Sequence, residues 1–422
     1  MLRQAAPRLE AKREMTEVSS SGAVSNRVVL AQITDRRPGG RARERQAVMR
    51  RSPALAAVTA TVVAMVLAGG SAYAGRPSAI PAGFRAQSLS WISPTQGWML
   101  GVGPCTVSTC TTVVGTTDGG GTWNTLGTLN ASLTLEQETG VTEVRFADAL
   151  HGWAFWPALW RTRDGGATWK KQRPPGGGHQ VLALAGDSDV VYAVVSPCRL
   201  DRICDRPVTL WRTTPGQGSW TQVPLSLPAT TSQVVLAVHG IVAYLAIPAG
   251  LLGPSLDPDV LEVTVDGQQW SPRPDPCDPA NDETLVSVAP LSDTKVALLC
   301  VGDPGIGQAT KRVLRSNDTG QTTWPAGTTP RDGIVSLIAA APNGTLAVSS
   351  WGAPGSWIYR NGDGQTWTTS VSLSDFGEGW NDIVFTTNKV GFVVYGPAGV
   401  WPYNRVGELW QTQDGGLTWA PV

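Results

Sequence analysis

The sequence predicts an all-β protein built as a seven-bladed β-propeller, a ring of seven sheets around a common axis. Two observations predict this fold. The chain has 422 residues and 18 Trp, more Trp than Phe and Tyr combined. Seven of these Trp close related segments and lie 46, 51, 50, 54, 43 and 52 residues apart. A period near 50 residues, with several short strands in each unit, is typical of a propeller blade. The seven are Trp123, Trp169, Trp220, Trp270, Trp324, Trp367 and Trp419.

Charge divides the chain into two parts, although its formal net charge is zero. Residues 1–51 hold 12 Lys and Arg against 5 Asp and Glu, whereas the rest holds 21 against 28. The part that folds is therefore mildly acidic, which argues against nucleic acid as a partner.

The first element is an export signal that starts late in the chain. Arg50 and Arg51 precede an uncharged apolar run at 54–67, and Ala72-Tyr73-Ala74 follows. This order predicts a signal peptide at 49–74, cleaved after Ala74, and a secreted or extracytoplasmic protein. An uncleaved N-terminal membrane anchor is the alternative. We expect residues 1–48 to be disordered, and Met49 to be the initiator, in which case they are not translated.

A linker at 75–83 is expected to lead into the propeller at 84–422. The predicted blades lie at 84–128, 140–174, 179–225, 231–274, 284–326, 333–371 and 379–422. Within each blade, alternating β segments are separated by Gly-containing turns, as in Gly152-Trp153-Ala154-Phe155 and Gly391-Phe392-Val393-Val394.

One turn recurs near the end of each unit. Residues 116–123, 162–169 and 412–419 share the pattern T-x-D-x-G-x-T-W. Four copies are degenerate: Pro215 replaces Asp in 213–220, the copies at 264–270 and 361–367 are one residue shorter, and that at 316–324 is one longer. Asp accepts hydrogen bonds from its own turn, Gly supplies positive φ and Trp fills space between blades. We therefore assign structural roles to Asp118, Trp123, Asp164, Trp169, Asp266, Trp270, Asp318, Trp324, Asp363, Trp367, Asp414 and Trp419.

This turn resembles the Asp-box, or BNR repeat, of the sialidase and sortilin-type propellers. A second element, F-x-D-x(3)-G-W-A at 146–154, precedes the box at 162–169. The combination resembles the propeller of photosystem II assembly factors and their bacterial relatives over residues 84–422. The resemblance implies the architecture and identifies no partner.

Six Cys follow Ala74, an even number that favours disulfides in an exported chain. Six Cys allow 15 pairings. Proximity favours Cys105–Cys110 and Cys198–Cys204, which leaves Cys277–Cys300. Zinc is the competing interpretation, but the spacings and only three His fit it badly. All three bridges would lie in loops of one face, where they either rigidify a binding surface or simply staple long loops.

That face is expected to bind a protein or a cell-surface glycan, without catalysis. The candidate contacts are Trp156, Arg199, Trp351, Trp380, Trp401, Tyr403 and Arg405, the Trp having interblade packing as their alternative. No catalytic residue, cofactor or metal site is assigned. We expect a monomer, no nucleic-acid partner, and no stable membrane insertion once the signal is cleaved.

The alternative function is a glycoside hydrolase of the sialidase-like type. That chemistry needs a Tyr nucleophile with a supporting Glu, an Asp acid/base and three Arg. Phe84-Arg85 lacks the Ile-Pro that follows the first Arg in sialidases, and only Tyr403 has a nearby Glu, Glu408. An Arg cluster with a Tyr–Glu pair around the ring axis would favour the enzyme.

Overall fold

A computed structural model describes residues 79–106, 109–200, 204–229, 234–249, 258–302, 304–305, 307–375, 377–397 and 406–422. The predicted signal peptide at 49–74, the segment 1–48, and Trp401, Tyr403 and Arg405 lie outside these residues. Within the described part of the chain, no helix combines the length and apolar character needed to cross a bilayer.

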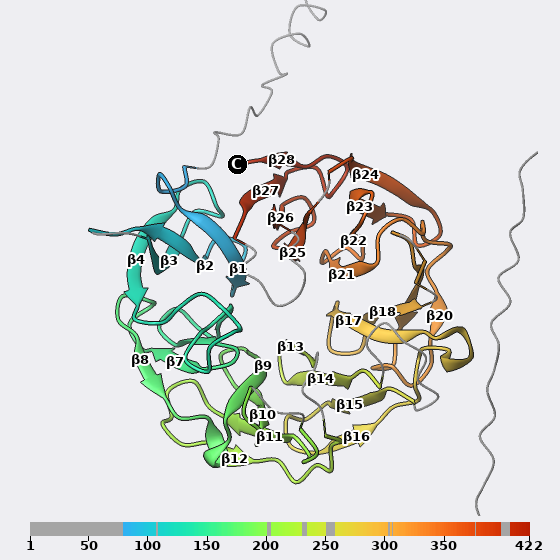
Figure 1. The fold of residues 1–422 in the computed structure, drawn as a ribbon. Helices are drawn as coiled ribbons and strands as arrows, with labels where there is room; N and C mark the ends of the chain where they lie inside the picture. The colour runs from blue at the N-terminus through green and yellow to red at the C-terminus, as the bar shows by residue number, and fades with distance from the viewer. Residues whose placement is uncertain are drawn as a thin grey trace, which may run out of the picture. The chain divides into compact units, whose positions relative to one another are not determined.

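The described residues form seven four-stranded antiparallel sheets arranged in a ring (Figure 1). Blade 1 contains β1 (Arg85–Trp91), β2 (Gly97–Pro104), β3 (Thr109–Thr116) and β4 (Asn124–Leu129). Blade 2 contains β5 (Glu143–Phe146), β6 (Gly152–Phe155), β7 (Leu159–Thr162) and β8 (Lys170–Gln172). Blade 3 contains β9 (Gln180–Gly186), β10 (Val191–Ser196), β11 (Thr209–Thr213) and β12 (Thr221–Gln222).

The remaining blades repeat this order. Blade 4 contains β13 (Val235–His239), β14 (Val242–Ile247), β15 (Val260–Thr264) and β16 (Trp270–Pro272). Blade 5 contains β17 (Thr284–Pro290), β18 (Val296–Gly302), β19 (Thr310–Ser316) and β20 (Trp324–Pro325). Blade 6 contains β21 (Val335–Ala340), β22 (Leu346–Gly352), β23 (Gly355–Asn361) and β24 (Trp367–Leu373). Blade 7 contains β25 (Glu378–Phe385), β26 (Gly391–Pro397), β27 (Glu408–Thr412) and β28 (Ala420–Pro421).

Burial follows the position of a strand within its blade. The second strands, such as β10 and β14, are buried along their whole length, whereas outer strands such as β8 and β12 are mostly exposed. A strand covered on both faces by neighbouring blades needs apolar residues throughout, rather than in alternation. The core is accordingly divided into seven apolar clusters, each formed by residues of two adjacent blades.

The first strands line the inside of the ring and contact one another in the order β1, β5, β9, β13, β17, β21, β25 and back to β1. No strand is shared between blades 7 and 1. Their junction is instead closed by a backbone pair, in which Ala86 N donates to Gly407 O (2.9 Å) and Gly407 N donates to Ala86 O (2.7 Å). The C-terminal Val422 packs into the same junction, against the cluster that contains Met99 and Phe392.

Four of the recurrent turns share one hydrogen-bond pattern. Asp118 Oδ1 accepts from the Thr116 hydroxyl and the Thr122 amide, both at 2.8 Å, and its Oδ2 accepts from the Thr122 hydroxyl at 2.8 Å. Asp164, Asp318 and Asp414 make the same three contacts. The motif Asp is thus an internal acceptor that orders its own turn.

The Trp that closes each turn packs mostly against the preceding blade. Trp123 meets Phe392 edge to face at 6.5 Å, Trp220 meets Trp153 at 6.3 Å, and Trp270 lies 5.2 Å from Tyr192. Trp324 departs from the expected interblade role, because 40% of its surface is exposed. Thr322 takes the usual place of the motif Thr, so the extra residue Thr323 shifts Trp324 by one position along the strand. A shift of one residue turns a side chain to the other face of a sheet.

Candidate ligand-binding face

One end of the ring carries the connections between second and third strands and between consecutive blades. These connections touch: backbone bridges join Pro207 to Ala229 and Gln308 to Asp332. The structure contains the three predicted disulfides, Cys105–Cys110, Cys198–Cys204 and Cys277–Cys300. Each has at least one cysteine in a connection at this end, so the three covalent links share one face. We call it the loop face.

A hollow of about 270 Å³ opens on the loop face at blade 3. One wall comes from the blade 2–blade 3 connection, and the other from β11 and from Pro197 and Arg206, which flank the segment closed by Cys198–Cys204. Its lining combines apolar Pro175 and Trp211 with the charged or ionisable Arg206 and His179. Apolar walls with a few polar groups are the usual composition of a ligand pocket.

Local contacts hold these walls in place. The Trp211 Nε1 donates to the Thr209 hydroxyl at 2.9 Å, and the Arg206 guanidinium donates to Pro197 O across the disulfide segment. Gly176 (φ 65°) lies so close to Trp211 that a Cβ there would come within 2.3 Å of the indole ring. The connection therefore needs glycine at this position both for its backbone conformation and for its approach to the ring.

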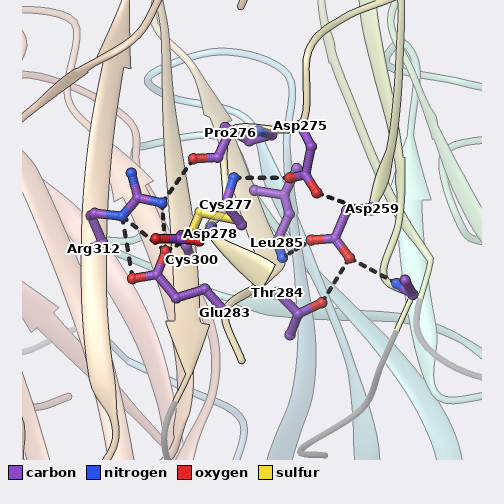
Figure 2. Close-up of a disulfide and its surroundings, with 11 residues drawn as sticks. Asp259, Asp275, Pro276, Cys277, Asp278, Glu283, Thr284, Leu285, Cys300 and Arg312 are labelled. Atoms are coloured by element: carbon purple, nitrogen blue, oxygen red, sulfur yellow. Dashed lines mark hydrogen bonds and ion pairs between the residues drawn. A yellow bond between two sulfur atoms is a disulfide. The ribbon is translucent and has the colours of Figure 1, made fainter. Parts of the chain in front are cut away.

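The Cys277–Cys300 bridge joins the blade 4–blade 5 connection to β18 (Figure 2). Beside it, Asp259 Oδ1 accepts from the Thr284 hydroxyl (3.0 Å) and the Ala249 amide (2.7 Å), while Oδ2 accepts from the Leu285 amide (2.5 Å). Burial raises the pKa of the neighbouring Asp275, whose oxygens accept from the Asp259 and Cys277 amides.

Asp259, Asp275 and Cys277 bring possible metal-ligand atoms within 4.8 Å of one another. Each carboxylate oxygen already accepts a backbone amide, and the sulfur of Cys277 is oxidised in the bridge to Cys300. A disulfide offers no thiolate ligand. The residues fit a folded connection rather than a metal centre.

An ion pair lies on the other side of this bridge. Arg312 Nη2 and Nε contact Glu283 Oε2 at 2.5 and 2.9 Å, and Nη2 also donates to Pro276 O at 3.0 Å (Figure 2). Glu283 in turn accepts from the Asp278 amide. The connection is thus fixed by a covalent bond, an ion pair and backbone hydrogen bonds together.

A second charged group lies on the innermost strands of blades 7, 1 and 2. Arg145 lies 3.3 Å from Glu143 and 3.6 Å from Asp382, and Ser88 donates to both carboxylates. The three charged side chains are 22–33% exposed. Burial raises the pKa of Glu143, and this outweighs the opposing effect of Arg145. Two carboxylates at the ring axis are the feature of this structure closest to hydrolase chemistry.

Sialidase-like chemistry needs a Tyr nucleophile, but the tyrosines of the described residues do not lie beside the two carboxylates. Tyr192, Tyr244 and Tyr359 are fully buried between blades, and Tyr395 packs against Trp380. Burial raises the pKa of Tyr192 and Tyr244 to about 12. A raised pKa disfavours the phenolate, so neither Tyr192 nor Tyr244 is prepared to attack a substrate.

The structure places the predicted contact residues in different environments. Arg199 lies at the loop face and forms a two-point ion pair with Glu138, at 2.9 and 3.1 Å. Trp156 (φ 64°) and Trp351 are partly buried and pack against interblade clusters. The prediction of a ligand contact at Trp380 is wrong, because this side chain is 1% exposed and lies in the core between blades 6 and 7.

Three arginines with a structural role were not predicted from the sequence, although they share a sequence pattern. An Arg precedes the first residue of the recurrent turn in the segments Trp160-Arg161-Thr162, Trp211-Arg212-Thr213 and Tyr359-Arg360-Asn361. Each reaches a backbone carbonyl of the next blade's turn. Arg161 donates to Pro215 O, Arg212 to Gly267 O (2.8 Å) and Arg360 to Gly415 O (2.7 Å). These arginines fasten adjacent blades.

No protein-family model and no curated protein matches the chain. Among solved structures, YCF48 bound to D1 peptide is 17% identical, with a TM-score of 0.49 over 79% of this chain and 95% of that one. YCF48 from Cyanidioschyzon merolae is 16% identical, with a TM-score of 0.47 over 80% and 97%. The GH93 α-L-arabinofuranosidase of Fusarium graminearum is 13% identical, with a TM-score of 0.43 over 80% and 97%.

Proposed function

We propose that this chain is an exported propeller of the Asp-box type that binds a protein or a cell-surface glycan through the loop face, without catalysis. Three disulfides in the described residues are typical of a chain that folds outside a reducing compartment. Export by the signal at 49–74 agrees with this chemistry. The Asp-centred turns, with their shared hydrogen bonds, support the assignment to the Asp-box type.

The observation that carries the proposal is the placement of all three cross-links on one face. Loops that are already ordered lose less conformational entropy when a partner binds. The hollow beside Cys198–Cys204 offers such a surface, with Trp211 as an apolar wall and Arg206 and His179 as polar groups. An aromatic wall with an arginine suits either a sugar ring or a peptide side chain.

Catalysis is the less favoured function, for a specific reason. The two carboxylates near the axis are both held by Arg145 and Ser88, and the described tyrosines lie in the cores or pack against Trp. Both groups act as structural ties between blades. A hydrolase would need at least one of these carboxylates to be available to a substrate.

The test is binding of residues 75–422 to a glycan array and to immobilised envelope proteins. We expect Arg206→Ala with His179→Ala to weaken retention at least tenfold, and Lys389→Ala, an exposed change on the opposite end, to leave it unchanged. Fluorogenic glycosides are assayed in parallel. Hydrolysis that is abolished by Glu143→Gln would overturn the proposal in favour of a glycoside hydrolase. Equal retention of the double variant and the unmodified protein would show that the hollow is not the binding site.

A further inference from the structure

A second hollow, of about 350 Å³, lies on blade 2 near the opposite end of the ring from the loop face. Three of its five lining residues are basic, and none is acidic. The folded part of the chain is acidic overall, so this concentration of positive charge is a local feature. The lining consists of Arg161, Arg163, Thr168, Lys170 and Gln172.

Strand register brings the basic residues together. Arg161 on β7 lies directly opposite Lys170 on β8, and Leu159 lies opposite Gln172. Directly paired residues project to the same face of a sheet. On β6 and β7, Trp153 is paired with Arg161, and Trp153 packs against Trp220 of blade 3. The basic face of blade 2 is therefore the one turned toward blade 3.

Arg161 forms the deep wall of this hollow. It is 4% exposed, its guanidinium lies 5.3 Å from the centre of the Trp153 ring, and it donates to Pro215 O through Nη2. Its Nε, also buried, has no hydrogen-bond partner among the described residues. Burying a guanidinium with an unused donor is costly unless a further acceptor is supplied.

The facing turn carries no carboxylate, because Pro215 occupies the position of the motif Asp and Arg161 reaches only its backbone carbonyl. The nearby acids are already engaged: Asp164 accepts from Thr162 and Thr168, and Asp148 pairs with His151 at 2.8 Å. Arg163 and Lys170 are exposed and have no ion pair in the described structure.

The seven repeats provide an internal comparison. If Arg163 and Lys170 served the fold, the other blades would carry similar residues at the same positions, and none does. The residues equivalent to Arg163 are Thr117, Thr214, Val265, Asn317, Gly362 and Gln413. Those equivalent to Lys170 are Asn124, Thr221, Ser271, Trp324, Thr368 and Ala420. Arg161, Arg163 and Lys170 occur together only in blade 2, and blade 3 is the blade whose turn lacks the motif Asp.

We propose that this hollow binds a tetrahedral oxyanion, a phosphate or sulfate group, between Arg161, Arg163 and Lys170. A guanidinium presents a planar fork of donors to such an anion, and an ammonium adds a mobile point charge. The oxyanion balances the charge of three cations that form no ion pair with the described residues. The group is either a free ion or an ester on an envelope polymer. This site is independent of the loop face and of the function proposed for it.

Titration of residues 75–422 with inorganic sulfate and inorganic phosphate, at constant ionic strength set with chloride, tests the site. We expect saturable binding by calorimetry and a rise in Tm. Arg163→Gln with Lys170→Gln should weaken binding at least tenfold, equivalent to about 1.4 kcal/mol. Lys171→Gln is the matched control, because it removes the same charge from the same strand on the other face.

Both substitutions are on exposed side chains, so the variant is expected to fold, and its Tm in chloride verifies this. Equal binding by the double variant and the Lys171→Gln control would overturn the proposal, as would tighter binding of acetate than of sulfate. A sulfated or phosphorylated polysaccharide distinguishes the sources. Higher affinity per group than the inorganic ion identifies an ester on a polymer, whereas equal affinity identifies the free ion.

Discussion

Arg145 connects three blades at the axis of the ring. It extends from β5 of blade 2, donates to Ser88 Oγ and Leu89 O of blade 1, both at 3.0 Å, and pairs with Asp382 of blade 7. Asp382 Oδ2 also accepts from the Leu89 amide at 3.0 Å. Burial opposes the charge of Arg145, but Asp382 and Glu143 outweigh it and raise the pKa of the guanidinium. This group lies beside the junction between blades 7 and 1.

Replacing Asp382 with Asn should therefore destabilise the fold. The change keeps the shape but removes the charge that balances Arg145, and we expect a loss of about 2 kcal/mol in the free energy of unfolding. Urea denaturation followed by Trp fluorescence measures it. Asp293→Asn is the control, because the Asp293 side chain is 78% exposed, and its effect should stay within about 0.5 kcal/mol. Equal effects of the two changes would contradict the assigned role.

At the scale of the element, the burial of the Trp that closes a recurrent turn depends on the register of that Trp along its strand. Trp123 is 4% exposed and Trp324 is 40% exposed, although both close the same turn. Trp123→Ala should cost about 3–5 kcal/mol, and Trp324→Ser less than about 1 kcal/mol. Thermal unfolding of both variants measures the difference. A similar loss for the two would mean that Trp324 packs inward after all.

The Asp residues of these turns make the fold sensitive to acid. The pKa is lowered in all six, and in Asp318 the hydroxyl of Thr322 is the largest cause of a shift to about 2. An unfolded Asp titrates near 3.9, so each of these carboxylates contributes its full stability above that pH and loses it as the pH falls through its lowered pKa, which is about 2 for Asp318. The urea midpoint should accordingly decline steeply between about pH 4 and pH 2.

Asp318→Asn tests this origin of the acid sensitivity. The variant should be less stable at neutral pH, because the amide is a weaker acceptor, and its urea midpoint should fall less steeply below pH 4. Asp205→Asn, an exposed change away from any turn of this type, should keep the slope of the unmodified protein. An unchanged slope in Asp318→Asn would show that other carboxylates determine the acid response.

The architecture of the molecule could be predicted because it is repeated, and its sites could not because they are exceptions to the repeat. The spacing of Trp123, Trp169 and the later copies is visible in one dimension, and so is the proximity that favours Cys198–Cys204. The Arg145 group is not visible, because its members lie in three blades and share no pattern. Trp324 is exposed because its turn has one extra residue. The sequence does not show whether an extra residue lies before or after the motif Thr, and this decides which way the Trp faces.

The same contrast explains why the burial of Trp380 could not be predicted. An aromatic residue near a loop, such as Trp380, has the same local sequence signature whether it faces solvent or the next blade. Pro215, by contrast, is a visible departure from a motif, yet its consequence appears only when Arg161 of the preceding blade is seen to face it. Departures from a repeat are therefore the positions to inspect first for function, once the neighbouring unit is known.

For the whole ring, the weakest point should be the junction between blades 7 and 1. Every other junction joins blades that are consecutive in the chain, whereas this one depends on the Ala86–Gly407 backbone pair, the packing of Val422 and the Arg145 group. Native-state hydrogen exchange should show the Ala86 and Gly407 amides opening at lower free energy than the Val181 amide, which bonds Pro157 O between blades 2 and 3. Asp382→Asn should lower protection at Ala86 and Gly407 more than at Val181, because Asp382 ties blade 7 to blades 1 and 2, whereas the Val181 bond joins blades 2 and 3. Uniform loss of protection at all three amides would instead mean that the ring opens as a single unit, with no preferred junction.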